Sequence, residues 1–110
     1  MEYRSLGPDL PAPARIVLGT MIFGLDRADH WFALLDEYTA MGGNCVDTAR
    51  IYRGGEGERL IGEWLRRRGI RDEFLILTKG AHPKSDGLPR VRPDAIAEDL
   101  EQSLDALGVD

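Results

Sequence analysis

The sequence predicts an α/β fold built around a parallel sheet. Three short apolar segments, each typical of a buried strand, alternate with three segments whose apolar residues recur at helical spacing. Each strand and helix unit is on the order of 30 residues long, a rhythm typical of right-handed βαβ crossovers. The chain has 110 residues, of which 43% are hydrophobic and 30% charged, so we expect one domain, residues 1–110, with a buried core and a solvated surface.

Three apolar runs are expected to form the strands, and they are residues 16–19, 45–47 and 74–79. A proline-rich lead-in precedes the first run, which we expect to be buried and to enter a loop at its end. The third run is apolar without interruption up to Thr78. This pattern fits a parallel strand covered on both faces better than an exposed, alternating one.

Each strand is followed by a helix whose ends carry recognisable signals. Asp29 is the expected N-cap of the first helix, Gly69 ends the second, and the third begins near Pro93 and ends at Gly108. The expected buried faces are Trp31, Leu34, Leu35, Tyr38 and Met41 in the first helix, Leu60, Ile61, Trp64 and Leu65 in the second, and Ile96, Leu100, Leu104 and Leu107 in the third.

Composition argues against several classes of protein. The net charge of -5 disfavours a nucleic-acid binder, and the one basic cluster, Arg66-Arg67-Arg68, ends a predicted helix, where cations complement the helix dipole. Cys45 is the only cysteine, so an internal disulfide is impossible and nothing points to an oxidising compartment. We find no signal peptide, membrane span or metal-binding motif, and we expect a cytoplasmic protein.

Three polar side chains are expected to meet at one edge of the sheet. Asp47 and Lys79 each end a predicted strand, and Tyr52 lies in the loop after the first of them. In parallel α/β folds, the loops after the strands gather at one edge, where ligands bind. An ammonium beside a phenol lowers the phenol's pKa from about 10 towards neutrality, and such a phenol can protonate a carbonyl oxygen. The pattern also fits a structural interpretation, with a capping aspartate, a solvent-facing lysine and a tyrosine covering the core.

Several separated motifs in register resemble the aldo-keto reductases. They are Leu18-Gly19-Thr20-Met21, Gly42 to Ala49 with Tyr52, Gly54 to Glu58 with Ile61-Gly62 and Trp64-Leu65, Leu77-Thr78-Lys79, and the closing segment from Asp99 to Asp110. The resemblance implies the first three βα units of a (β/α)8 TIM barrel that binds NADPH and reduces aldehydes or ketones to alcohols.

The resemblance also implies roles for individual residues. Tyr52 takes the place of the family's general acid, Lys79 that of the lysine that lowers its pKa, and Asp47 that of the aspartate that pairs with the lysine and lies close to the nicotinamide. Thr20 and Met21 match the stretch that contacts the nicotinamide half of the cofactor. The family's catalytic histidine follows its fourth strand, after the last residue of this sequence. His82 is more simply interpreted as a loop residue.

The length and the resemblance together suggest a piece of a larger enzyme. The chain has 110 residues, and a typical barrel of this kind has about 250. We therefore expect a fragment that lacks full activity on its own. An alternative is a non-catalytic regulatory subunit that keeps the fold and binds the cofactor. The expected partner is a small carbonyl substrate, with no nucleic acid or membrane; the substrate's identity and the oligomeric state stay open.

Overall fold

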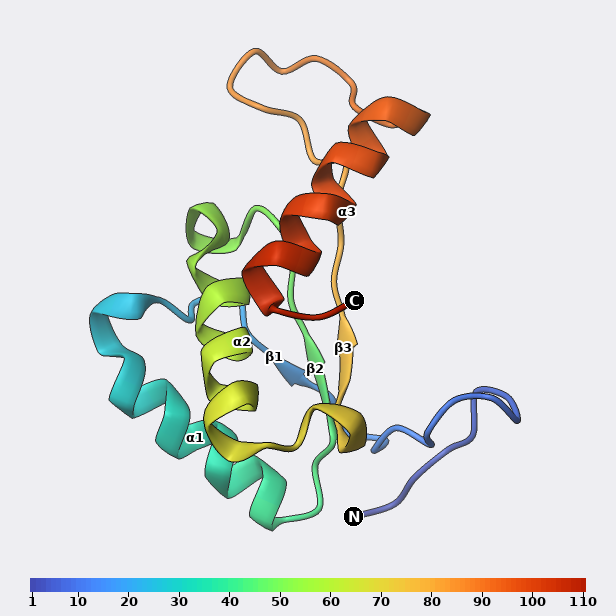
Figure 1. Cartoon of the computed structure of the whole chain (residues 1–110), viewed down its shortest axis with the longest axis vertical. Coiled ribbons are helices and arrows are strands. Elements are labelled where there is room, and N and C mark those ends of the chain that lie inside the picture. The colour runs from blue at the N-terminus through green and yellow to red at the C-terminus, as the bar shows by residue number, and fades with distance from the viewer.

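The computed structural model describes residues 1–110 and contains three strands that alternate with three α-helices (Figure 1). The strands are β1 (Leu18–Gly19), β2 (Cys45–Asp47) and β3 (Leu75–Leu77). The helices are α1 (Ala28–Ala40), α2 (Glu56–Arg68) and α3 (Pro93–Leu107). The strands lie in the order β1-β2-β3, and both pairs are parallel. The predicted α/β class with a parallel sheet is therefore confirmed.

The register brings the ends of the strands level with one another. Asp47 lies opposite Gly19 on one side and Leu77 on the other. The pairing of β2 with β3 continues past the strand ends, because Thr48 N–H donates to the Leu77 carbonyl at 2.8 Å and Arg50 N–H donates to the Lys79 carbonyl at 2.9 Å. The loops after β2 and β3 therefore leave the sheet at the same edge, towards the top of Figure 1.

The core lies between the sheet and its helices. Trp64 of α2 is fully buried, and its ring meets the edge of Phe74 at a centroid distance of 5.1 Å. Phe23, in the loop after β1, stacks on Trp31 of α1 at 4.6 Å. The twelve residues of this cluster are Phe23, Trp31, Phe32, Leu35, Tyr38, Val46, Leu60, Ile61, Trp64, Leu65, Phe74 and Leu107.

Polar contacts and a glycine hold α2 against its neighbours. Asp36 of α1 accepts hydrogen bonds from Trp64 Nε1 at 2.8 Å and from Arg68 at 2.8 and 2.6 Å. Figure 1 shows α2 and α3 side by side. A Cβ atom on Gly62 would collide with the Leu107 carbonyl, so the absence of a side chain allows this close approach. Arg68 belongs to the basic cluster, which lies in the last turn of α2 as predicted.

The predicted ends of α2 and α3 are confirmed. Gly69 and Gly108 adopt left-handed φ angles of 67° and 66°, which glycine reaches without strain, and Pro93 occupies the first turn of α3. The predicted start of α1 is wrong. Asp29 lies inside the first turn, and Arg27 occupies the cap position without a side-chain hydrogen bond, because a short 3-10 turn, Leu25–Arg27, leads directly into the helix.

The predicted buried face of α2 is confirmed, and those of α1 and α3 are partly wrong. In α1, Leu34 and Met41 are exposed and Phe32 is buried in their place. In α3, Ile96 and Leu100 are 47% and 53% exposed, and Leu104 is half-buried. The face of α3 that packs inward consists of Ala95, Asp99, Ser103 and Leu107. Small residues and an ion-paired aspartate therefore form this contact, which hydrophobic periodicity does not reveal.

The strands are shorter than predicted and less covered. Ile16 and Val17 are exposed and precede β1, and Leu77 at the end of β3 is 54% exposed. The helices cover one side of the sheet, so the expectation of a third strand buried on both faces is wrong for Leu77.

Candidate active site

Lys79 and Asp47 form an ion pair across the ends of β2 and β3. Lys79 Nζ donates hydrogen bonds to Asp47 Oδ1 and to the Thr48 carbonyl, both at 2.6 Å. The side chains of Lys79 and Asp47 are 46% and 37% exposed, so the pair is accessible from solvent. The parallel register produces this contact, because Asp47 ends β2 and Lys79 follows the end of β3 by two residues, at the same edge of the sheet.

The environment of Lys79 favours its charged form. Partial burial acts against the ammonium, but the hydrogen bond and the attraction of the Asp47 carboxylate outweigh it, and Tyr52 adds to their effect. The pKa of Lys79 therefore lies above its ordinary value of 10.5. The side chain carries a fixed positive charge at neutral pH.

Tyr52 lies beside this ion pair. Its ring is beneath Lys79, with Nζ at 5.1 Å from the ring centroid, so the ammonium contacts the face of the ring. Tyr52 begins a tight turn in which Arg53, Gly54 and Gly55 all have positive φ angles, of 51°, 64° and 92°. The glycines turn the chain back into α2, because they adopt positive φ angles without strain. The structure thus brings Asp47, Tyr52 and Lys79 together.

Thr20 and Met21 follow β1 at the same edge of the sheet. Thr20 is fully buried, and both its backbone N–H and its hydroxyl donate to the Asp47 carbonyl at 3.0 Å. The side chain of Met21 is exposed. Thr20 therefore fixes β1 against β2, and of the two residues Met21 is the one whose side chain is open to contact.

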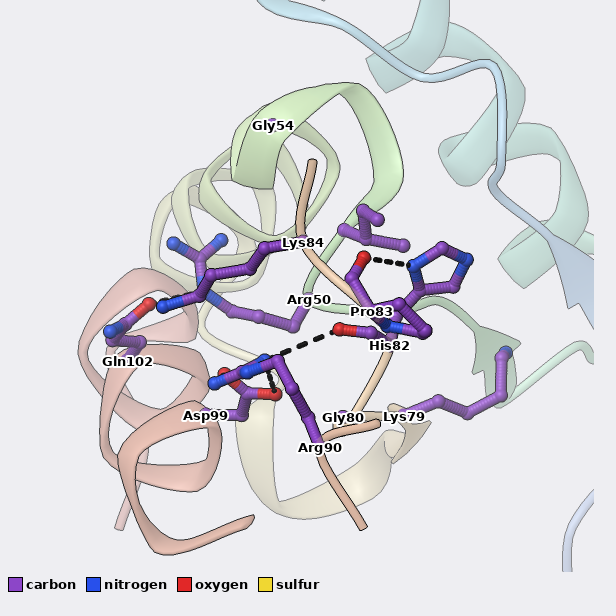
Figure 2. A pocket seen from close by; sticks show the side chains of 11 residues that line it. Arg50, Gly54, Lys79, Gly80, His82, Pro83, Lys84, Arg90, Asp99 and Gln102 are labelled. Carbon is purple, nitrogen blue, oxygen red and sulfur yellow. Dashed lines mark hydrogen bonds and ion pairs between the residues drawn. The ribbon is translucent and has the colours of Figure 1, made fainter. Parts of the chain in front are cut away.

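A pocket of about 200 Å³ adjoins Lys79 between the loops that follow β2 and β3 (Figure 2). Arg90 closes one side of it, with two hydrogen bonds to Asp99 of α3 at 2.8 and 2.9 Å. Asp99 also accepts a hydrogen bond from the Ala81 N–H at 2.7 Å. The Arg90 and Asp99 pair therefore anchors the loop between β3 and α3 to the helix.

His82 lies at the rim of this pocket and outside the cluster of Asp47, Tyr52 and Lys79. Its Nδ1 is 2.8 Å from the Pro83 carbonyl oxygen, to which it can donate (Figure 2). No hydrogen bond joins it to Asp47 or Lys79. This geometry agrees with the interpretation of His82 as a loop residue.

One polar residue near the site, Glu58, is absent from the predicted site residues. Glu58 of α2 is fully buried, and its Oε1 accepts a hydrogen bond from the Thr78 hydroxyl at 2.8 Å. A signal was available, since Glu58 shares the helical phase of Ile61 and Leu65, at i+3 and i+7, both of which are buried. A carboxylate on the buried face of a helix indicates a specific partner.

The structure holds no group of three or more histidine, cysteine, aspartate or glutamate side chains arranged to bind a metal ion. Judged by length and hydropathy, none of its helices could cross a bilayer.

Comparison with known proteins shows what this chain is similar to. Norsolorinic acid reductase B of Aspergillus parasiticus is 39% identical over 91 residues, which cover 73% of this chain and 23% of that protein. An aldo-keto reductase of Bacillus halodurans, solved in its holo form, superposes with a TM-score of 0.84 and 27% identity, covering 100% of this chain and 37% of its own. An aldo-keto reductase of Klebsiella pneumoniae, solved in complex with NADPH, gives a TM-score of 0.72 and 27% identity over 90% of this chain and 33% of its own.

The chain thus spans under a quarter of the length of the first two curated relatives, 23% and 22%. Its three βα units correspond to part of the (β/α)8 TIM barrel of the solved structures, and the predicted fold is confirmed to that extent. The family model described as "Aldo/keto reductase family" matches residues 15–110. On this evidence, the chain belongs to the aldo/keto reductase family of oxidoreductases.

Proposed function

We propose that the protein to which these residues belong is an NADPH-dependent reductase of aldehydes or ketones. Its proton donor is Tyr52, assisted by Lys79 and Asp47. The observation that supports this most directly is the cluster itself, in which Lys79 Nζ lies 2.6 Å from Asp47 Oδ1 and 5.1 Å from the centroid of the Tyr52 ring. Because the chain covers only part of its relatives, the activity is proposed for the whole protein.

Each residue of the cluster has a distinct task in this reaction. The Tyr52 hydroxyl donates its proton to the carbonyl oxygen of the substrate. The phenol becomes negative as the proton leaves, and the Lys79 ammonium above its ring stabilises that charge. Asp47 and the Thr48 carbonyl hold the ammonium in place and keep it charged. When bound, NADPH supplies the hydride that reduces the carbonyl carbon.

NADPH is supported as the cofactor by the aldo-keto reductase of Klebsiella pneumoniae, which was solved in complex with NADPH. Asp47 and Met21 expose side chains at the carboxyl edge of the strands, and they are the residues proposed to contact the nicotinamide end. Thr20, whose side chain is engaged by the Asp47 carbonyl, would keep Met21 in place there. A dinucleotide would reach further than these residues, so they fit one end of it.

Replacing Tyr52 by Phe in the whole protein tests the proton donor, because it removes the hydroxyl and keeps the ring. We expect kcat for a carbonyl substrate to fall by about 100-fold or more. The Kd for NADPH, measured by fluorescence titration, is expected to stay within about twofold. A matched control is Tyr3→Phe, because Tyr3 lies in the N-terminal segment and its hydroxyl bonds to the Gly42 carbonyl.

Retention of most of the turnover in Tyr52→Phe would remove Tyr52 from the acid role. Binding of NADPH by the unaltered protein without any turnover would favour a cofactor-binding regulatory subunit over an enzyme.

A further inference from the structure

A second polar cluster lies between α2 and the segments that follow β2 and β3, on the side of the sheet opposite to the Asp47 and Lys79 pair. Its centre is Glu58 of α2, which is fully buried. Oε1 of Glu58 accepts the hydrogen bond from Thr78 at 2.8 Å. Oε2 lies 3.7 Å from Arg50 Nη1 and accepts no hydrogen bond. We call Glu58, Thr78 and Arg50 the rear cluster.

A buried carboxylate with one unbonded oxygen is costly for stability. Transfer of a charged group from water to a protein interior carries a large penalty unless it is paired and fully hydrogen-bonded. The position of Glu58 near the start of α2 reduces this cost, because the helix dipole favours negative charge there. An apolar side chain of the same size would avoid the cost of burying a charge and would leave only the half-buried Thr78 hydroxyl without its partner, so stability alone gives little reason for a carboxylate here.

The alternation of side chains along a strand connects the rear cluster to the site. Successive residues point to opposite faces, so Thr78 points towards α2 where Lys79 points towards Asp47. The same holds for Thr48, which is fully buried near Gly57 of α2, beside the exposed Asp47. A contact that fixes the side chain of Thr78 therefore also fixes the direction in which Lys79 leaves the strand.

Arg50 provides the second connection. Its N–H donates to the Lys79 carbonyl at 2.9 Å, and its Nε donates to Gln102 of α3 at 3.0 Å, as the neighbouring side chains in Figure 2 show. Its guanidinium packs against Gly55, where a Cβ atom would collide with it. The rear cluster thus contacts both segments that carry the pair. It holds Arg50, which follows Asp47, and Thr78, which precedes Lys79.

We propose that Glu58 is a positioning residue for the Asp47 and Lys79 pair, and that it acts through its hydrogen bond with Thr78 and its contact with Arg50. It touches neither substrate nor cofactor. Its effect is to keep the ends of β2 and β3 in the arrangement that brings Lys79 Nζ to 2.6 Å from Asp47. The inference rests on the proposed function in one respect, which is that the Asp47 and Lys79 pair takes part in the reaction.

The sequence offers a direct measurement, because Lys79 and Lys84 are its only lysines. Trace acetylation with acetic anhydride at pH 8, followed by mass spectrometry, gives the labelling ratio of Lys79 to Lys84 within one chain. Only the uncharged amine reacts, so tight pairing with Asp47 protects Lys79. Lys84 lies in the loop before α3, beside Glu98, and serves as the internal reference. Asp47→Asn gives the ratio for a Lys79 that has lost its carboxylate partner and keeps only the Thr48 carbonyl.

Three variants and one conservative control separate positioning from stability. Thr78→Val leaves the buried Glu58 carboxylate without its hydrogen-bond donor, and Glu58→Met leaves the half-buried Thr78 hydroxyl without its acceptor. Both losses are costly. The double variant replaces both partners by apolar side chains of similar shape, so it should recover stability relative to each single variant. Glu58→Gln keeps an acceptor oxygen for Thr78 and is the conservative control. Urea unfolding, followed by fluorescence of the buried Trp31 and Trp64, reports stability.

We expect the double variant to be folded and its labelling ratio to be raised about threefold, because a Lys79 that is less tightly paired with Asp47 has a lower pKa. Glu58→Gln is expected to keep the ratio of the unaltered protein. A folded double variant with an unchanged ratio would overturn the proposal. So would a double variant that does not fold, because the bond would then serve the fold itself. The measurement uses no substrate or cofactor. If the unaltered protein has no reductase activity and the double variant still shows the raised ratio, only the proposed function is contradicted.

Discussion

Lys79 reaches across from β3 to bind Asp47 of β2, and it binds the carbonyl of the next residue, Thr48, at the same distance of 2.6 Å. The ammonium thus joins two strands by a side-chain and a main-chain acceptor together. A charge held by two acceptors on one neighbouring strand has little freedom to move along the sheet. Its position over the ring of Tyr52 is therefore determined largely by the pairing of β2 with β3.

The pairing of Lys79 with Asp47 should stabilise the fold in a pH-dependent manner. Since the folded-state pKa of Lys79 is raised above 10.5, the stabilisation is fully present below about pH 10 and is lost as the pH rises through the raised value. Asp47→Asn removes it. We expect that variant to lose up to about 1 kcal/mol of unfolding free energy at pH 8, a small value because both side chains are partly exposed.

The check is urea unfolding of both proteins at pH 8 and at pH 11.5. The difference between them should be smaller at the higher pH, which lies above the ordinary pKa of Lys79. The titration of buried Tyr38, whose pKa is raised by burial, destabilises both proteins alike at high pH and cancels in the comparison. A difference that grows with pH would contradict the assignment.

Asp99 should make the fold sensitive to acid. The hydrogen bonds from Arg90, together with that from the Ala81 N–H, hold the pKa of Asp99 below its ordinary value of 3.8. The stability that the Asp99 carboxylate contributes to the fold is therefore present above about pH 4, and it is lost as the pH falls through the lowered pKa of Asp99. Asp99→Asn should lower Tm at pH 6 by on the order of 5 °C, because it removes the buried one of the two carboxylates that Arg90 binds and leaves only the more exposed Glu98.

Thermal unfolding between pH 6 and pH 3 tests this expectation. The Tm of the unaltered protein should approach that of Asp99→Asn as the pH falls. Asp105→Asn is the matched control, because Asp105 lies on the same helix, is exposed and forms no ion pair. If the two substitutions lower Tm equally, the pairing of Asp99 with Arg90 makes no specific contribution to stability.

Gly62 should be intolerant of even a methyl group. A Cβ atom there meets the carbonyl of Leu107 at the end of α3, and a main-chain group cannot turn aside as a side chain can. Gly62→Ala is expected to cost about 1–3 kcal/mol, although alanine is the better helix former. Gly19→Ala is the control, since a Cβ atom on Gly19 meets nothing within 4 Å. Urea unfolding of the two variants should show a loss for Gly62→Ala that Gly19→Ala does not share.

The parts of the fold that depend on local chemistry were predictable from the sequence. Glycine ends helices because it adopts left-handed φ angles, and this placed the ends of α2 and α3 at Gly69 and Gly108. The meeting of Asp47 with Lys79 followed from a general property of parallel sheets, whose strand ends lie at one edge.

The parts that depend on distant partners were not predictable in this way. Asp99 is buried in α3 because Arg90 reaches it from the preceding loop, and Ile96 is consequently turned outward. Glu58 was overlooked for a similar reason. Its helical phase points inward, but a glutamate in the first turns of a helix usually faces water, and its partners Thr78 and Arg50 come from segments that the helix pattern does not reveal.

Asp47 and Thr48 follow one another in the chain, and their side chains lie on opposite faces of the sheet where β2 ends. A change of residue type at either position replaces a side chain on one face only. Insertion or deletion of one residue between positions 47 and 50 would reverse the face to which each following side chain points. A side chain that now bonds to α2 would then point towards the Asp47 and Lys79 pair. During the evolution of this family, the length of this segment should therefore be conserved more strictly than its residue types.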